Sequence, residues 1–203
     1  MLDQLSIALV AEDALSMAVM ERVVKSSGRP FVISRRFIER GFGNIKRSVT
    51  KYRQASHVIP HIVLTDLDGG ACPVALRAEW GATDLPDFML FRVAVRETES
   101  WLLGDRDGFA DFASVAKVKI SVEPEQLPDP KEALIDLVRR GRNKRLAAEL
   151  VPSPGSAASI GPLYNEKLIS FVEQRWDVEA AAAACPSLHR MRQRLASFLQ
   201  TAG

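Results

Sequence analysis

Two aspartates, Asp66 and Asp68, follow a run of apolar residues and have the side chains and spacing of a metal-binding pair. The run at residues 62–64, Ile-Val-Leu, is typical of a strand buried on both faces. Such a strand ends at the carboxyl edge of a parallel sheet, where α/β proteins place their chemistry. Two carboxylates so close repel each other unless a cation shares them, so the pair predicts an oxygen-only site for Mg²⁺ or Mn²⁺. The alternative is a turn or a helix cap.

Further carboxylates are expected at the same edge, because the carboxyl ends of parallel strands share one side of a sheet. Glu12 comes after the first predicted strand, and Glu97 and Glu99 come after the fourth. The alternatives are a first-turn glutamate favoured by the helix dipole for Glu12, and a solvated helix start for the other two. The predicted metal ligands are Glu12, Asp66, Asp68, Glu97 and Glu99, and the first four of these are also the predicted catalytic residues.

The composition predicts a globular protein of the cytoplasm. The chain has 203 residues, of which 47% are hydrophobic, and this length and composition suit one α/β domain with a helical appendage. Its net charge is +2. Its two cysteines, Cys72 and Cys185, lie far apart without a neighbouring histidine pair, which argues against a zinc site or disulfide framework and fits a reducing compartment. Charged residues interrupt every apolar run before a membrane span is complete, so we expect no contact with a membrane.

Alternating strand and helix patterns predict an α/β fold, with a parallel four-stranded sheet flanked by helices and a C-terminal helical extension. The predicted strands are residues 6–10, 31–34, 62–64 and 89–95. Beyond about residue 105 the patterns are helical only, and Asp129-Pro130 begins one of these helices with an N-cap and a proline at the first position. We therefore expect an α/β core over residues 1–105 and a helical extension over 106–203, together forming one compact unit.

A glutamate after the first strand, followed later by a strand that ends in Asp-Leu-Asp-Gly at residues 66–69, resembles the Toprim domain. This domain occurs in topoisomerases, primases and nucleases of the overcoming-lysogenization-defect family, and the resemblance covers about residues 5 to 105. The run from Arg92 to Asp105 is similar to the signature of a narrower bacterial family, domain of unknown function 4276. Segments at residues 129–131 and 185–187 resemble that family as well. The resemblance implies a Toprim-like, Rossmann-like core.

The Toprim resemblance also implies roles for individual residues. Glu12 would be the general acid or base of strand cleavage, and Asp66 and Asp68 would hold Mg²⁺. Primase-type domains have a further acid one turn after the glutamate, where this sequence has Ser16, so hydrolysis is the simpler chemistry, with Glu97 supplying the missing acid.

A covalent topoisomerase mechanism is not expected, because neither Tyr52 nor Tyr164 lies in the context of a nucleophilic tyrosine. The resemblance to the lysogenization-defect nucleases further implies an ATPase partner protein.

Two basic clusters predict contact with the phosphates of nucleic acid. Their proposed binding residues are Arg35, Arg36, Lys46 and Arg47 in the first cluster, and Arg139, Arg140 and Arg142 in the second. Clusters of this kind are the electrostatic footprint of contacts with backbone phosphates. The alternative is a solvated surface with basic residues at helix C-termini.

The sequence thus predicts a Mg²⁺-dependent phosphodiester hydrolase that acts on nucleic acid, in phage defence or DNA repair. One alternative is a phosphatase of the haloacid dehalogenase type, because residues 64–69 also resemble its nucleophile motif. In that case Asp66 would attack phosphorus and Asp68 would act as acid and base. That motif normally follows the first core strand, however, whereas two strands precede it here. The other alternative is a Toprim-like module that binds a nucleotide or nucleic acid without catalysis.

Overall fold

A computed structural model describes residues 4–200 of the chain, apart from the side chain of Phe42. Internal contacts divide the chain into two compact units. The sheet unit comprises the residues up to Val95 and those from Ser187 onward, and the helical unit comprises Arg96–Pro186.

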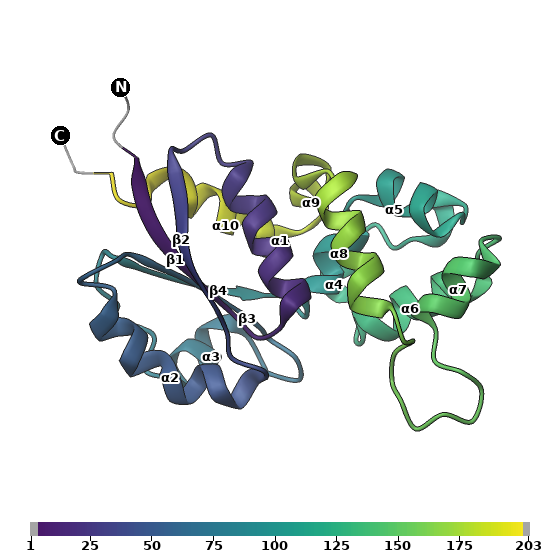
Figure 1. Cartoon of the computed structure of the whole chain (residues 1–203), viewed down its shortest axis with the longest axis horizontal. Coiled ribbons are helices and arrows are strands. Elements are labelled where there is room, and N and C mark those ends of the chain that lie inside the picture. Colours follow the sequence, from purple (N-terminus) through teal and green to yellow (C-terminus); the bar gives the residue numbers. More distant parts are fainter. Residues whose placement is uncertain (1–3, 201–203) are drawn as a thin grey trace. The chain divides into compact units, whose positions relative to one another are not determined.

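The sheet unit contains a parallel four-stranded sheet with the strand order β2-β1-β3-β4 (Figure 1). The strands are β1 (Leu5–Ala11), β2 (Phe31–Ile38), β3 (His61–Asp66) and β4 (Met89–Ala94). Every residue of β3 is buried, as its apolar run predicts for a strand in the middle of a sheet. The predicted α/β class with a parallel sheet is therefore confirmed.

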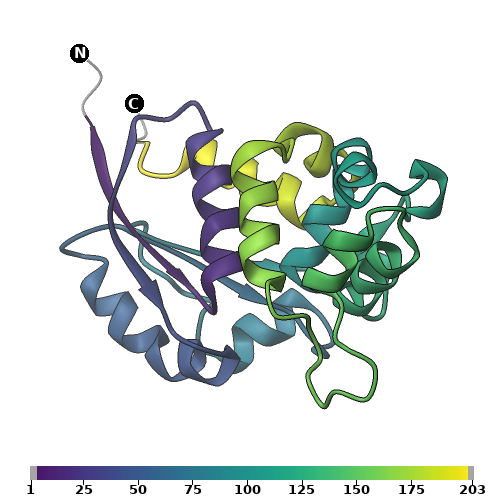
Figure 2. The same ribbon diagram turned by 45° about the vertical axis from the view of Figure 1, so that its right-hand side comes forward.

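Helices cover both faces of this sheet. They are α1 (Ala14–Lys25), α2 (Phe42–Ala55), α3 (Pro73–Glu79) and α10 (Pro186–Ser197), which belongs to the sheet unit from Ser187 onward. Helices α2 and α3 lie on one face, and α1 and α10 lie on the other (Figures 1 and 2). Under α2 and α3, a hydrophobic cluster joins Ile45 and Val49 of α2 to Val63 of β3 and to Leu67, the residue after β3. This packing fixes the end of β3 on the core.

Strand β2 is longer than the predicted strand at residues 31–34. It continues through Arg35 and Arg36 to Ile38, with a bulge at Ser34, whose hydroxyl donates to the carbonyl of Ile7 at 3.0 Å. Because β2 is an edge strand, polar residues occur on it where a strand buried on both faces would be apolar. Arg35 and Arg36, the first two residues of the first basic cluster, therefore belong to a strand.

The helical unit consists of helices and short 3₁₀ turns. Its elements are α4 (Thr98–Gly104), α5 (Arg106–Ala113), α6 (Pro130–Arg140), α7 (Lys144–Leu150), α8 (Tyr164–Gln174) and α9 (Val178–Ala184), with turns η1 (Lys117–Lys119) and η2 (Pro124–Gln126). Every residue of α4 is buried, and α4 packs against α6 and α9. Asp129 caps α6 by accepting from the amide of Glu132 at 2.7 Å, as the sequence predicts.

The units divide at residues 95 and 187, whereas the sequence suggested a boundary near 105 and assigned the C-terminal helix to the extension. Helix α10 belongs to the sheet unit, and hydrogen bonds near both of its ends connect it to that unit. The amide of Val95 donates to the hydroxyl of Ser187 at 3.3 Å, and the Arg29 guanidinium donates to the carbonyls of Ala196 and Phe198. Among residues 4–200, no helix combines the length and apolar character needed to cross a membrane.

Candidate metal and catalytic site

Glu12 lies directly after β1, at the carboxyl edge of the sheet. Its carbonyl accepts from the amide of Gly41 at 3.3 Å, which ties this position to the loop after β2. The next residue, Asp13, is the N-cap of α1 and accepts from the amide of Ser16 at 2.8 Å. Glu12 is therefore not the first-turn glutamate that the alternative interpretation suggested, because it precedes the cap and its side chain is available for other contacts.

The Glu12 carboxylate reaches across to the end of β3. Its Oε1 atom accepts one hydrogen bond from the hydroxyl of Thr65 and another from the backbone amide of Asp66, the latter at 2.9 Å. Burial raises the pKa of Glu12, the two hydrogen bonds lower it, and the negative charges of Asp68 and Asp13 raise it further; the net shift is upward. The side chain is thus held in place by neutral donors and is biased toward keeping a proton.

Asp66 and Asp68 are presented by the turn that follows β3. The intervening Leu67 is buried in the hydrophobic cluster, and its carbonyl accepts from the amide of Gly70 at 2.9 Å. Asp66 is buried at the end of the strand, whereas Asp68 is exposed and has a left-handed backbone, with φ at 49°. Aspartate tolerates this conformation better than most residues. The turn therefore places one carboxylate at the sheet edge and one toward solvent.

The capping alternative for the two aspartates is not what the structure shows. The N-cap of α3, the next helix, is Cys72, whose sulfur accepts from the amide of Ala75 at 3.4 Å. Asp66 and Asp68 thus precede the helix without capping it. Glu12, Asp66 and Asp68 come from two neighbouring strands of one unit, and the structure brings these three predicted site residues to one edge of the sheet.

The donor chemistry of this edge fits a hard divalent cation, since the carboxylates offer only oxygen. No group of three or more His, Cys, Asp or Glu side chains within residues 4–200 is arranged to enclose a metal ion. Mg²⁺ in proteins is commonly bound by one or two carboxylates and completed by water and substrate phosphates. The two aspartates suit that kind of open site.

Comparison of the chain with family models, with curated proteins and with solved structures finds no match. The Toprim resemblance and the narrower one therefore stay expectations from the sequence, and the site is argued from its geometry.

Glu97 and Glu99, the other two predicted metal ligands, belong to the helical unit and are held there by α6 and α8. The Glu97 Oε2 atom accepts from the backbone amide of Lys131, in the first turn of α6, at 3.1 Å. The Lys131 ammonium lies 3.7 Å from Glu97 Oε1 and 3.8 Å from Glu99 Oε1. The Tyr164 hydroxyl also donates to Glu99 Oε1, at 2.9 Å. A lysine of the chain itself thus supplies positive charge to this acid pair.

Burial dominates the chemistry of Glu99. Only 4% of its side chain is exposed, and this burial raises its pKa to about 7 against the lowering effect of the Lys131 charge. Glu97 adds negative charge that favours the protonated form, and the Tyr164 hydroxyl favours the ionised one. A carboxyl group that titrates near neutral pH in this way is a candidate proton carrier as well as a structural group.

The predicted phosphate-binding residues differ in how far acids of the chain already neutralise them. The Arg36 Nε atom lies 2.5 Å from Glu21 Oε1, and the Lys46 Nζ atom lies 2.5 Å from Glu79 Oε1. Further partners are Asn44 for Arg47 and Asp136 for both Arg139 and Arg140. In contrast, the exposed side chains of Arg35 and Arg142 form no ion pair within residues 4–200. Arg47 is exposed as well, and its partner Asn44 is a neutral amide, so Arg35, Arg47 and Arg142 have the most charge to offer a phosphate.

Three polar side chains contact the predicted acids, and the sequence did not predict these contacts. Thr65 directly precedes Asp66, and this position could have indicated that its hydroxyl belongs to the site. Lys131 follows the Asp129-Pro130 cap, but nothing in its spacing indicates an acid pair over thirty residues away as its partner. Tyr164 opens α8 and lies 65 residues from Glu99 in the sequence. Contacts of this kind depend on the packing of helices, which a residue pattern does not specify.

Proposed function

We propose that this protein is a phosphodiester hydrolase that depends on Mg²⁺ or Mn²⁺ and acts on nucleic acid, with Glu12, Asp66 and Asp68 at its catalytic site. The observation that carries the proposal is a contact across the sheet edge, where the Glu12 carboxylate accepts hydrogen bonds from the Thr65 hydroxyl and the Asp66 amide. The negative charge of Asp68 also raises the pKa of Glu12. The Toprim resemblance supports the same three residues.

In this proposal Asp66 and Asp68 hold the divalent ion through carboxylate oxygens. Such an ion would supply positive charge to the phosphoryl group under attack. The aspartates are suited to this task because one is fixed at the end of a buried strand and the other is exposed to solvent. The open site leaves room for water and phosphate oxygens to complete the coordination.

Glu12 is proposed to move the proton. Hydrolysis forms a bond from a water oxygen to phosphorus and breaks the bond to the leaving oxygen, so the water loses a proton and the leaving group gains one. Both hydrogen bonds to Glu12 end on Oε1, so Oε2 is the atom that would accept or give this proton. An upward-shifted pKa brings a carboxyl group closer to neutral pH, where proton transfer in both directions is most efficient.

The nucleic-acid substrate is inferred from the basic residues. Arg35 on β2 and Arg142 after α6 are exposed and form no ion pair within residues 4–200, so each can contact a backbone phosphate. The ATPase partner implied by the resemblance stays a prediction.

The proposal is tested by incubating the protein with plasmid DNA and with RNA, in Mg²⁺, in Mn²⁺ and with EDTA. We expect cleavage that needs the metal and is lost in the Asp66→Asn, Asp68→Asn double variant, while Glu173→Gln, an exposed acid on α8, changes nothing. Cleavage that persists in EDTA or in the double variant would contradict the proposal. Binding of nucleic acid without turnover would favour the binding module. Beryllium fluoride bonded to Asp66 in a structure would favour the phosphatase.

A further inference from the structure

Four arginines meet at β4, the edge strand of the sheet opposite β2. Arg92 comes from β4 itself, Arg77 comes from α3, and Arg190 and Arg194 come from α10. Burial and the like charges of the other three arginines together lower the pKa of Arg92 to about 10. We call these four residues the arginine cluster. Three sequence-distant elements build it.

The positive charge of the arginine cluster is not balanced by the chain. None of its members forms an ion pair within residues 4–200, and the buried Nε atom of Arg92 has no hydrogen-bond partner there. Arg77 is oriented by a hydrogen bond from its Nε atom to the carbonyl of Ala82, at 3.0 Å. Like charges held together with a buried unsatisfied donor cost free energy, which a bound anion would offset.

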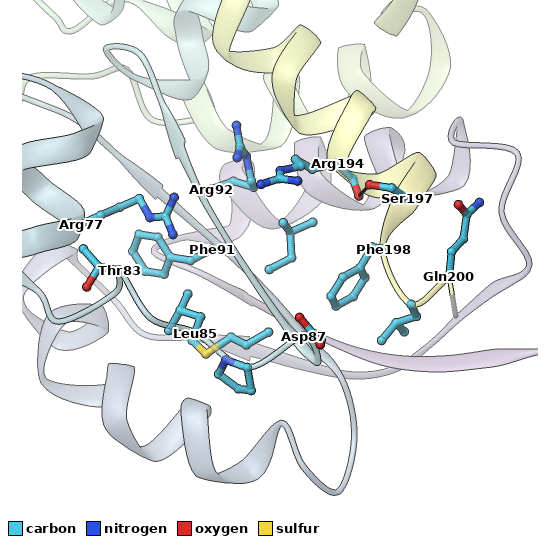
Figure 3. Close-up of a pocket in the computed structure, with 14 residues that line it drawn as sticks. Arg77, Thr83, Leu85, Asp87, Phe91, Arg92, Arg194, Ser197, Phe198 and Gln200 are labelled. Atoms are coloured by element: carbon cyan, nitrogen blue, oxygen red, sulfur yellow. Dashed lines mark hydrogen bonds between the residues drawn. The ribbon is translucent and has the colours of Figure 1, made fainter. Parts of the chain in front are cut away.

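Two pockets open on the arginine cluster. The larger has a volume of about 360 Å³ and is lined by Arg77, Arg92 and Arg194, together with the rings of Phe91 and Phe198. Figure 3 shows Arg92 and Arg194 close together on the side of β4 toward α10, with Arg77 and Phe91 on the other side of the strand. The smaller pocket, of about 220 Å³, is lined by Arg77, Arg92 and Arg190 among others. The two pockets thus share two arginines.

We propose that these pockets form a binding site for a small phosphorylated molecule, whose phosphate oxygens are held by the arginine cluster. The planar fork of an arginine matches a phosphate through two parallel hydrogen bonds, which a lysine does not provide. The larger pocket has the volume of a small-molecule site, and its phenylalanines offer an apolar wall for the rest of the ligand. A polynucleotide is less suited, because backbone contacts follow an extended charged surface rather than a pocket of about 360 Å³.

The larger pocket is separate from the proposed hydrolytic site, whereas the smaller one also includes Val93, near the carboxyl end of β4. The larger pocket includes Leu85, Asp87 and Met89, so it lies by the amino-terminal end of β4. The acids follow the carboxyl ends of β1 and β3, at the opposite edge of the parallel sheet. The arginine cluster also needs no divalent ion, so the two proposals can fail independently.

The test is a calorimetric titration of the full chain with pyrophosphate, and separately with a nucleoside monophosphate, in a buffer with EDTA so that no metal site contributes. We expect binding of at least one probe by the unchanged protein. Arg194→Gln should weaken this binding by about tenfold to a hundredfold, the effect of losing a charge-assisted hydrogen bond. Arg175→Gln, an exposed arginine at the end of α8, is the matched control and should bind as the unchanged protein does.

Thermal melting without ligand separates loss of the site from loss of the fold. Because Arg194 repels Arg92, the Arg194→Gln variant should melt at or above the temperature of the unchanged protein although it binds the probe less tightly. Arg92→Gln should weaken binding in the same way. The proposal is overturned if neither probe binds, if Arg194→Gln binds like the control, or if only an oligonucleotide binds and does so through these arginines.

Discussion

The sheet unit and the helical unit each carry two acids separated by one residue, but they balance the charge in different ways. In the sheet unit, Glu12 beside Asp66 and Asp68 is held by a hydroxyl and an amide, which are neutral donors. In the helical unit, Glu97 and Glu99 share the ammonium of a lysine. An acidic pair in a sequence therefore indicates a need for positive charge, which in the helical unit a lysine of the chain supplies.

The first prediction concerns Glu12, the glutamate of the sheet unit. Glu12→Gln should lower hydrolysis by about 10²- to 10⁴-fold, because an amide keeps the shape but cannot transfer a proton. Its melting temperature should stay close to that of the unchanged protein, since Gln can still accept from Thr65 and from the Asp66 amide. Single-turnover cleavage rates and thermal melts measure the two effects. A variant that is inactive only because it is unfolded would not support the assignment.

The second prediction is that Glu99→Gln stabilises the protein at high pH. The pKa of Glu99 is raised to about 7 in the folded state from an ordinary value of 4.5, so the folded state binds the proton more tightly than the unfolded state. The contribution of Glu99 to stability is therefore full below about pH 4.5 and is lost as the pH rises through 7, by up to about 3 kcal/mol. Chemical denaturation from pH 4 to 9 should show a flatter profile for the variant.

The third prediction concerns the cation of the helical unit. Lys131→Met should lower the free energy of unfolding by roughly 1–2 kcal/mol above pH 7, because it removes the charge shared by Glu97 and Glu99. The lysine side chain is 39% exposed, so water screens part of this effect. The loss should shrink toward pH 5, where Glu99 is protonated. An equal loss at both pH values would show that Lys131 contributes packing rather than charge.

The fourth prediction has the smallest effect and compares Arg35 and Arg36, two neighbouring residues of β2. Arg36 is paired with Glu21, whereas Arg35 forms no ion pair within residues 4–200. Replacing Arg35 with glutamine should therefore weaken nucleic-acid binding more than replacing Arg36, and should flatten the salt dependence by about one unit of slope at most. Fluorescence titrations of one oligonucleotide at several salt concentrations compare the two variants. A larger effect for Arg36 would mean that its pair with Glu21 opens on binding.

The sequence predicted those parts of the fold that depend on local patterns. The apolar run of β3 and the Asp129-Pro130 start of α6 were both identified, since burial and capping leave local signals. The second half of β2 was missed because an edge strand can carry polar residues, and α5 and α7 were not assigned to particular residues. The sequence also indicated the acids of the sheet edge. Their donors and the Lys131 partner depend on packing between distant segments, which spacing does not encode.

We propose that the acids of the sheet unit bind the metal, whereas those of the helical unit do not require one. Calorimetric titration with Mn²⁺ tests it directly on the unchanged protein, on the Asp66→Asn, Asp68→Asn variant and on a Glu97→Gln, Glu99→Gln variant. We predict that binding is lost in the aspartate variant and retained in the glutamate variant. Retained binding in the aspartate variant, or loss in the glutamate variant alone, would contradict the account and assign the metal to the helical unit.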